Sequence, residues 1–162
     1  MGIRFRELKE NDIPKVISMF SNLSKEMVKV SFTEIASMEE IRGWIKKPDT
    51  FVYVAADGDV ISAVLRAKRG KGDKRHSCNL TLAVDYNFRG NSIAKELMEY
   101  AIENLKDKGI QILRAHVYSN NKPSINTILS CGFTFAGNVH MHHYDEKMKG
   151  YIDDLIFHKI LR

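Results

Sequence analysis

The stretch Leu82-Ala-Val-Asp-Tyr-Asn-Phe-Arg-Gly-Asn-Ser-Ile-Ala-Lys95 joins two segments whose patterns are the clearest in the chain. Before it, apolar residues alternate with small or polar residues from His76 to Val84, which predicts a strand. After it, an apolar residue recurs at every fourth position from Ile93 to Leu105, which predicts a long amphipathic helix. The stretch is therefore a strand-to-helix connection, and the rest of the fold is worked out from it.

The turn inside this stretch has the features of an anion site. Arg89 and Gly90 precede a helix that begins at Asn91 or Ser92, and the free N–H groups at such a helix start converge on one point where the dipole favours an anion. Gly90 permits a positive φ, and Asn91 tolerates one better than most residues. The turn predicts a cradle for a phosphate or pyrophosphate. The alternative is an ordinary strand-to-helix turn with a Ser or Asn N-cap.

The flanking sequence alternates between helical and strand patterns. Its order is strand, two helices, three strands, helix, strand, helix and two strands, which mixes hairpins with crossovers. We therefore predict an α/β fold with helices on both faces of one sheet. Residues 24–36 show no clear period. The other predicted strands are 3–9, 51–56, 60–67, 110–118, 133–143 and 151–160, and the other helices are 11–23, 37–47 and 121–129.

Length and composition predict a single globular domain over residues 1–162. The longest apolar run, Phe51 to Ala56, is six residues, whereas a transmembrane helix needs about 20. The N-terminus is charged from Arg4 and has no apolar signal region. Cys78 and Cys131 lie 53 residues apart in apolar segments, which predicts reduced core thiols. We expect a cytoplasmic protein that does not enter a membrane.

The net charge of +5 arises from 25 basic and 20 acidic residues, and only Lys68 to Arg75 is densely basic. This run is typical of a solvated hairpin loop, and a loop that contacts phosphates is the alternative. A nucleic-acid-binding protein that uses the loop is accordingly one of the functions left open, although we expect no nucleic-acid partner.

Residues Arg89 to Ala94 resemble the pyrophosphate loop of the GNAT superfamily of N-acetyltransferases, which reads Arg/Gln-x-x-Gly-x-Gly/Ala. Ser92 stands at the first glycine of that motif. A side chain there either crowds the cofactor or donates its hydroxyl to a phosphate oxygen.

A second motif of the family, Asn-x-x-Ala-Ile followed by Gly-Phe, is similar to Asn121, Ser124, Ile125, Gly132 and Phe133. The tail from Phe133 to Asp153 is similar to relatives that acylate amino acids and other small amines. The resemblance spans nearly the whole chain. It implies a mixed, mostly antiparallel sheet that splays between the fourth and fifth strands, residues 76–84 and 110–118.

The resemblance also implies that acetyl-CoA binds as cosubstrate in the splayed cleft. Asn121 has a second explanation, since Asn before Lys-Pro is a good helix N-cap. Main-chain groups of three residues would pair with the pantetheine arm like an added strand: Leu82, Ala83 and Val84. The pyrophosphate would be held by Arg89, Gly90, Asn91, Ser92, Ile93 and Ala94, and the arm would also meet Asn121 and Ser124.

The implied reaction is attack of a neutral primary amine on the thioester, which needs a base and a donor to the oxyanion. Ile128 occupies the position where relatives commonly carry a tyrosine acid, and Asn79 stands where some relatives carry an acidic residue. Asn79 could hold a water, and His76 is a candidate base because histidine is a residue type that commonly serves as one. The two are our candidate catalytic residues. A CoA-binding module without turnover is the alternative function.

We expect no metal. His140, His142 and His143 cluster in the sequence, but no carboxylate or cysteine stands at ligand spacing. The acceptor would be an amine of a small molecule or a peptide, in a pocket walled by residues 11–47 and 137–151. The side chains that could attract its ammonium, or simply be solvated acids, are Glu26, Glu34, Glu39 and Asp153. A homodimer stays open.

Overall fold

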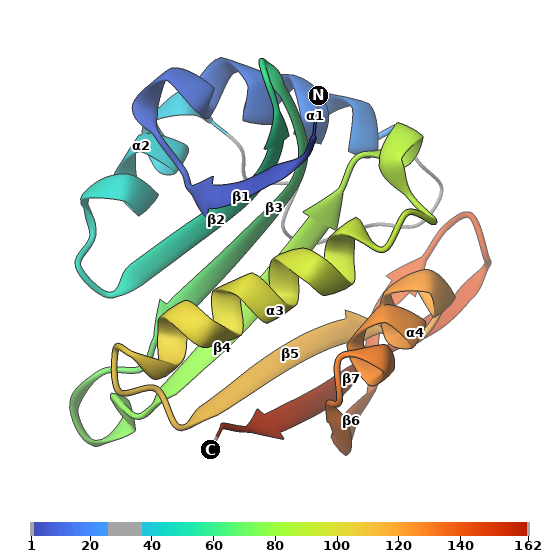
Figure 1. Cartoon of the computed structure of the whole chain (residues 1–162). Coiled ribbons are helices and arrows are strands. Elements are labelled where there is room, and N and C mark those ends of the chain that lie inside the picture. The colour runs from blue at the N-terminus through green and yellow to red at the C-terminus, as the bar shows by residue number, and fades with distance from the viewer. Residues whose placement is uncertain (1, 26–36, 162) are drawn as a thin grey trace.

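The computed structural model describes residues 2–25 and 37–161. They form a seven-stranded sheet in the order β1-β2-β3-β4-β5-β7-β6 (Figure 1). Every neighbouring pair is antiparallel except β4 and β5, which are parallel. The strands are β1 Arg4–Glu7, β2 Thr50–Asp57, β3 Val60–Arg69, β4 Ser77–Val84, β5 Ile112–Tyr118, β6 Thr134–Asp145 and β7 Gly150–Ile160. The predicted order of elements is confirmed.

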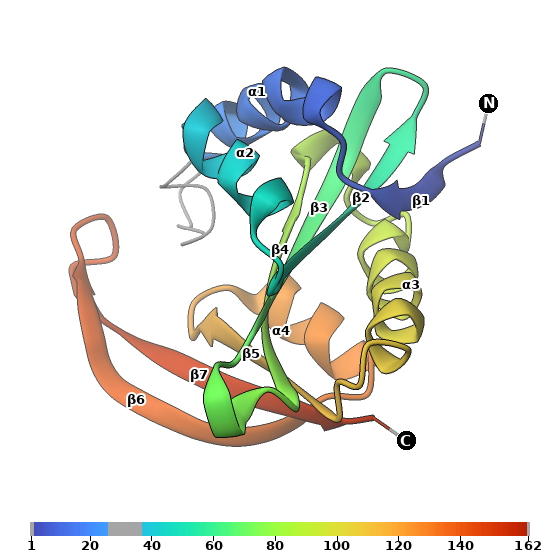
Figure 2. The ribbon, with the colours of Figure 1, turned by 90° about the vertical axis from the view of Figure 1, so that its left-hand side faces the viewer.

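Helices cover both faces of the sheet, as predicted. Figure 2 shows α1 and α2 on one side of the sheet and α3 on the other. Buried residues of α1 and α2 form one core with β2 and β3, and buried residues of α3 and α4 form a second core with β2 to β5 and β7. We call the two sides of the sheet the α1/α2 face and the α3/α4 face. The helices are α1 Ile13–Leu23, α2 Met38–Lys46, α3 Ile93–Lys106 and α4 Lys122–Ser130.

The alternation seen in the sequence assigns each strand residue to a face. Leu65 and Leu80 belong to the core with α3, whereas Val64 and Ala83 belong to the core with α1 and α2. Arg66 lies over the ring of Trp44 in α2, at 4.8 Å, and so marks the α1/α2 face of β3. The register then places Thr81, paired with Arg66, on that same face of β4.

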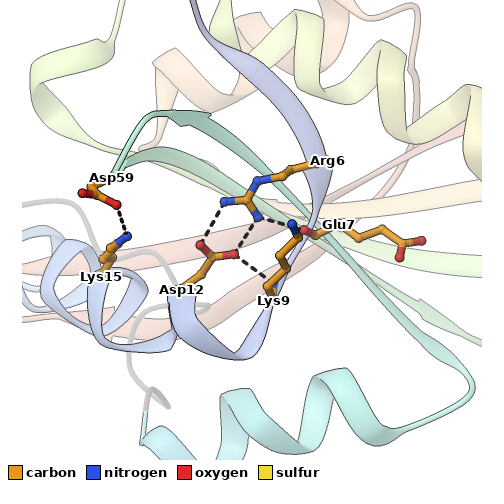
Figure 3. A network of polar contacts seen from close by, with 6 residues as sticks. All are labelled: Arg6, Glu7, Lys9, Asp12, Lys15 and Asp59. Atoms are coloured by element: carbon orange, nitrogen blue, oxygen red, sulfur yellow. Dashed lines mark hydrogen bonds and ion pairs between the residues drawn. The ribbon is translucent and has the colours of Figure 1, made fainter.

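An ion pair fixes the connection between β1 and α1 (Figure 3). The Asp12 carboxylate accepts two hydrogen bonds from the Arg6 guanidinium, at 2.7 and 3.0 Å, and a third from the Lys9 main-chain N–H at 2.8 Å. Burial would raise the pKa of Asp12, but the hydrogen bonds from Arg6 and Lys9 outweigh it and hold the pKa below its ordinary value. Asp12 is 2% exposed, so its charge is stable there only because these donors surround it.

Both cysteines are free and buried, which confirms their prediction as reduced core thiols. Burial raises the pKa of Cys78 to about 11 and also raises that of Cys131, so neither is an activated nucleophile. No described helix is long and apolar enough to cross a membrane.

The basic run from Lys68 to Arg75 does not form one surface. Lys68 and Arg69 end β3, and the next residues form a loop with a short 3-10 turn, Gly72–Lys74. Arg69 donates to the main-chain carbonyl of Lys108, and Arg75 lies 3.5 Å from the carboxylate of Asp49. Arg69 and Arg75 are therefore each engaged with another part of the chain.

Candidate active site

The sheet opens between its two parallel strands. β4 and β5 pair from Ser77 and Ile112 as far as Leu80 and Ala115, and beyond that point they are not hydrogen-bonded to each other. The predicted splay is confirmed in position, between the fourth and fifth strands. A cavity of about 920 Å³ occupies the opening.

This cavity passes through the sheet. Its walls include Leu82 and Met98 from the α3/α4 face, and Thr81, His116 and Tyr118 from the α1/α2 face. A molecule as long as a CoA thioester can therefore lie with its carrier on one face of the sheet and its acyl end open to the other. Such a passage suits a group transfer in which donor and acceptor arrive from opposite sides.

Main-chain groups of β4 point into the opening. The Asp85 N–H donates to the Ser62 carbonyl at 2.8 Å, so residues 85, 83 and 81 direct their N–H and C=O toward β3. By alternation, the N–H and C=O groups of Leu82 and Val84 point toward β5, which is no longer hydrogen-bonded to β4 at this level. A cofactor amide can pair with these groups as a strand would.

The turn after β4 has the backbone geometry that the predicted anion cradle requires. Ser92 precedes α3 with φ of 62° and Gly90 has φ of 82°, so both adopt the left-handed conformation. The first helical hydrogen bond of α3 is donated by the Glu96 N–H to the Ser92 carbonyl, and the N–H groups of residues 93–95 point beyond the helix start. The Ser92 side chain does not cap the helix, which excludes the simple N-cap explanation of this turn. Arg89 donates to the Val84 carbonyl at 3.3 Å.

Asn121 caps a helix and also lies in the cavity wall. Its Oδ1 accepts from the Ser124 N–H at 3.3 Å and caps α4, and the residue also lines the cavity. Ile128 is 4% exposed and packs in the core at the cavity wall, so α4 presents an apolar side chain where the relatives described above carry a tyrosine.

Most of the predicted cofactor residues come together in the cavity wall. Asn91 does not line it, although its neighbours do. Those that line it are Leu82, Ala83, Val84, Arg89, Gly90, Ser92, Ile93, Ala94, Asn121 and Ser124.

The two predicted catalytic residues are not in the cavity wall. His76 is exposed and immediately precedes β4, and its carbonyl accepts from Gln111 and Ile112, at the end of the strand opposite the opening. Asn79 is exposed on the α1/α2 face, two residues before Thr81. The structure thus brings neither side chain to the opening, because the strands separate only beyond Leu80.

A histidine that the sequence analysis did not select lies in the opening. His116 of β5 lines the cavity, and its Nδ1 lies 3.0 Å from Oδ2 of Asp154 in β7. Asp154 also lines the cavity and is 8% exposed, and its other oxygen, Oδ1, is buried without a hydrogen-bond partner among the described residues. The Thr81 hydroxyl in the same wall is also buried, with no hydrogen-bond partner in the part of the chain that the structure describes. Unsatisfied polar atoms in a cavity indicate a place for a polar ligand.

The three histidines of the tail do not gather around one point. His140 is within 3.2 Å of Asp153, while the ring of His143 contacts Tyr118 at 4.7 Å. β6 is irregular between Val139 and His143, and Met141 has φ of 51°, so the strand's alternation is broken there. Within residues 2–25 and 37–161, no group of three or more His, Cys, Asp or Glu side chains could hold a metal ion. Glu26 and Glu34, considered above for an ammonium, lie outside the described residues.

Comparison of the whole chain with solved structures gives close matches in fold. A GNAT-family acetyltransferase from Streptococcus pneumoniae has a TM-score of 0.86 at 18% identity, over 98% of this chain and 99% of that one. An N-acetyltransferase from Staphylococcus aureus Mu50 has a TM-score of 0.87 at 17% identity, over all of both chains. A ribosomal-protein-alanine N-acetyltransferase from Brucella melitensis has a TM-score of 0.83 at 24% identity, over 98% and 99%.

A search of curated proteins found no match. Residues 18–133 match the family described as the acetyltransferase (GNAT) family, whose members use acetyl-CoA as cosubstrate. The match covers the strand-to-helix cradle, the splayed strands and most of the cavity wall. With the fold and the opening between β4 and β5, it establishes that this chain belongs to the GNAT family of acetyltransferases.

Proposed function

We propose that the chain transfers an acetyl group from acetyl-CoA to a primary amine, with His116 as the base. The observation that carries the proposal is the cavity that passes through the sheet between β4 and β5, with the His116–Asp154 pair in its wall. It is supported by family membership and by the anion cradle before α3.

Acetyl-CoA would lie across the opening. The N–H groups at the start of α3 and the Arg89 guanidinium would hold the pyrophosphate. The pantetheine amides would pair with the main chain of Leu82 and Val84, and Asn121 would meet the arm from α4. An N–H of β4 beside the thioester would stabilise the oxyanion that forms during attack.

His116 would accept the proton that the amine loses. If the Asp154 carboxylate accepts a hydrogen bond from Nδ1–H, the Nε2 of the ring is left as the proton acceptor. The amine nitrogen forms a bond to the carbonyl carbon, the carbon–sulfur bond breaks, the proton passes to His116 and CoA leaves as the thiolate. A thiol pKa near 8.5 makes that thiolate a tolerable leaving group, so a buried Ile128 in place of an acid does not prevent turnover.

Titration calorimetry with CoA and acetyl-CoA tests the first step, and release of free thiol with a panel of primary amines tests the second. We expect saturable binding of both cofactors and amine-dependent thiol release. Absence of binding at millimolar ligand would refute the proposal. Binding without turnover on any amine would favour the CoA-binding module instead.

A further inference from the structure

The α1/α2 face carries a row of hydrogen-bond donors beside the cavity. The register pairs Lys68 of β3 with Asn79 of β4, Asn79 with Arg114 of β5, and Arg114 with His158 of β7. Residues paired across neighbouring strands project from the same face of a sheet. Four adjacent strands therefore place four donor side chains side by side, and we call Lys68, Asn79, Arg114 and His158 the cross-strand row.

Positive charge gathers at the β3 end of the row. Arg66 lies two residues before Lys68 on the same face and is held over the Trp44 ring at 4.8 Å. The pKa of Lys68 is lowered, first by the charge of Arg66, then by burial and by Lys47, while Glu40 acts in the opposite direction. A bound anion would relieve this repulsion.

Few of the described acidic side chains oppose the charges of Lys68 and Arg114. Among the described residues, no carboxylate forms an ion pair with either side chain, and Glu40 of α2 is the acidic group that acts on Lys68. Asp154, the nearest acid on β7, is already engaged with His116. Lys68 and Asn79 are exposed, and Arg114 and His158 are partly exposed, so a ligand can reach them.

The row stands at a defined distance from the reacting end of the cavity. Arg114 and His116 are two residues apart on one strand, so their side chains leave the same face roughly 7 Å from each other. Likewise, Asn79 stands two residues before Thr81, whose buried hydroxyl lines the cavity. A molecule whose amine lies at His116 can therefore extend an anionic end over the row.

We propose that the cross-strand row binds an anionic group of the acceptor, so that the substrate is a primary amine with a carboxylate or phosphate roughly 7 Å from its nitrogen. Lysine and arginine donors suit either anion. This inference rests on the proposed acetyl transfer. It also gives Asn79 a role in binding the acceptor in place of the catalytic role that its position in the sequence suggested.

Kinetics with matched amines test the substrate class. We expect kcat/KM to rise along the series from glycine to 6-aminohexanoate, and 6-aminohexanoate to exceed hexylamine by about 10-fold or more. An aminoalkyl phosphate of matched length distinguishes the two anions. Lys68→Gln and Arg114→Gln should each lower kcat/KM for 6-aminohexanoate about 10-fold more than kcat/KM for hexylamine. The control Lys71→Gln removes the same charge from the exposed loop and should change neither value. No preference in the wild type, or an equal loss for both amines in the variants, would overturn the inference.

A binding measurement separates this inference from the transferase proposal. Two product-like probes, 6-acetamidohexanoate and the neutral N-hexylacetamide, need no turnover and can be titrated into ¹⁵N-labelled protein. We expect saturable shifts of the Asn79 side-chain amide with the anionic probe alone, lost in Lys68→Gln and Arg114→Gln and kept in Lys71→Gln. Shifts that are the same for both probes would refute the row as an anion site, even if acetyl-CoA binds. Failure of acetyl-CoA to bind would refute the transferase, whatever the probes do.

Discussion

His116 Nδ1 and Asp154 Oδ2 lie 3.0 Å apart and join β5 to β7 at the point where β5 has lost its pairing with β4. The His116 side chain is 47% exposed and that of Asp154 is 12% exposed, so the carboxylate lies beneath the ring and the ring faces the cavity. A carboxylate that fixes one ring nitrogen leaves the other directed outward. The pair is thus oriented for proton transfer in the opening, although His116 and Asp154 are far apart in the sequence.

Replacing the base should slow the chemical step and leave cofactor binding unchanged. We expect His116→Ala to lower kcat by about 100- to 10⁴-fold, the usual contribution of general base catalysis, with an unchanged Kd for acetyl-CoA. Added imidazole should restore part of the rate, because the cavity left by the side chain is open to solvent. Asp154→Asn should cause a smaller loss than His116→Ala, and imidazole should not rescue it. Normal kcat in His116→Ala would exclude His116 as the base.

Reversing charge at the cradle should abolish cofactor affinity. Arg89 lines the cavity beside the start of α3, so Arg89→Glu would place a carboxylate next to the pyrophosphate. We expect the Kd for CoA, measured by calorimetry, to rise at least about 100-fold. Arg4→Glu makes the same charge change on β1, an edge strand separated from β4 by β2 and β3, and should leave the Kd unchanged. Equal affinity of Arg89→Glu and the wild type would show that the cofactor phosphates bind elsewhere.

Ser92 is held in a conformation that favours glycine. A φ of 62° destabilises a residue that has a Cβ by about 1 kcal/mol. The Ser92 side chain makes no hydrogen bond to the helix start that would offset this destabilisation. We expect Ser92→Gly to raise the free energy of unfolding by up to about 1 kcal/mol in urea titrations and to keep or improve CoA affinity. Ser92→Val, which adds a β-branched side chain at the same φ, should be less stable than the wild type. A stabilised Ser92→Val variant would contradict this account.

Local patterns in the sequence predicted the fold well because each element carries its own signal. The alternation predicted that Cys78, Leu80 and Leu82 share one face of their strand, and these residues lie in or against the core that contains α3. Ser37, at the start of the predicted helix 37–47, caps α2 with its Oγ accepting from the Glu40 N–H at 3.2 Å. Such signals involve residues within one turn or one strand, so they can be recognised without the tertiary structure.

The His116–Asp154 pair could not be found in this way. His116 is one polar residue in the alternating pattern of β5, and Asp154 follows Asp153 in β7. Their contact depends on the register between β5 and β7, in which Tyr118 faces Asp154. His76 was selected because it stands on the strand before the cradle, but the opening is at the other end of that strand. The sequence did show that His116 lies on the same face of its strand as Arg114 and Tyr118. Only the order of strands in the sheet shows that this face borders the opening.

Acid should weaken the fold through Asp12. The pKa of Asp12 is lowered in the folded state because its hydrogen bonds to Arg6 and Lys9 outweigh the opposing effect of burial. A carboxylate whose pKa is lower in the folded state stabilises the fold at pH values above its pKa in the unfolded chain, about 3.9. This stabilisation is lost as the pH falls through the pKa of the folded state. Asp12→Asn should therefore cost about 2 kcal/mol of unfolding free energy at pH 7, and the difference from the wild type should shrink below about pH 4.

Urea titrations of both proteins at pH 7 and pH 3 measure this difference. Asp59→Asn is the control, because the Asp59 side chain is 98% exposed and its ion pair with Lys15 is screened by solvent, so little change is expected at either pH. If Asp12→Asn lowers the free energy of unfolding by the same amount at both pH values, then the amide destabilises the fold for steric reasons. In that case the charge of Asp12 would not be what connects β1 to α1.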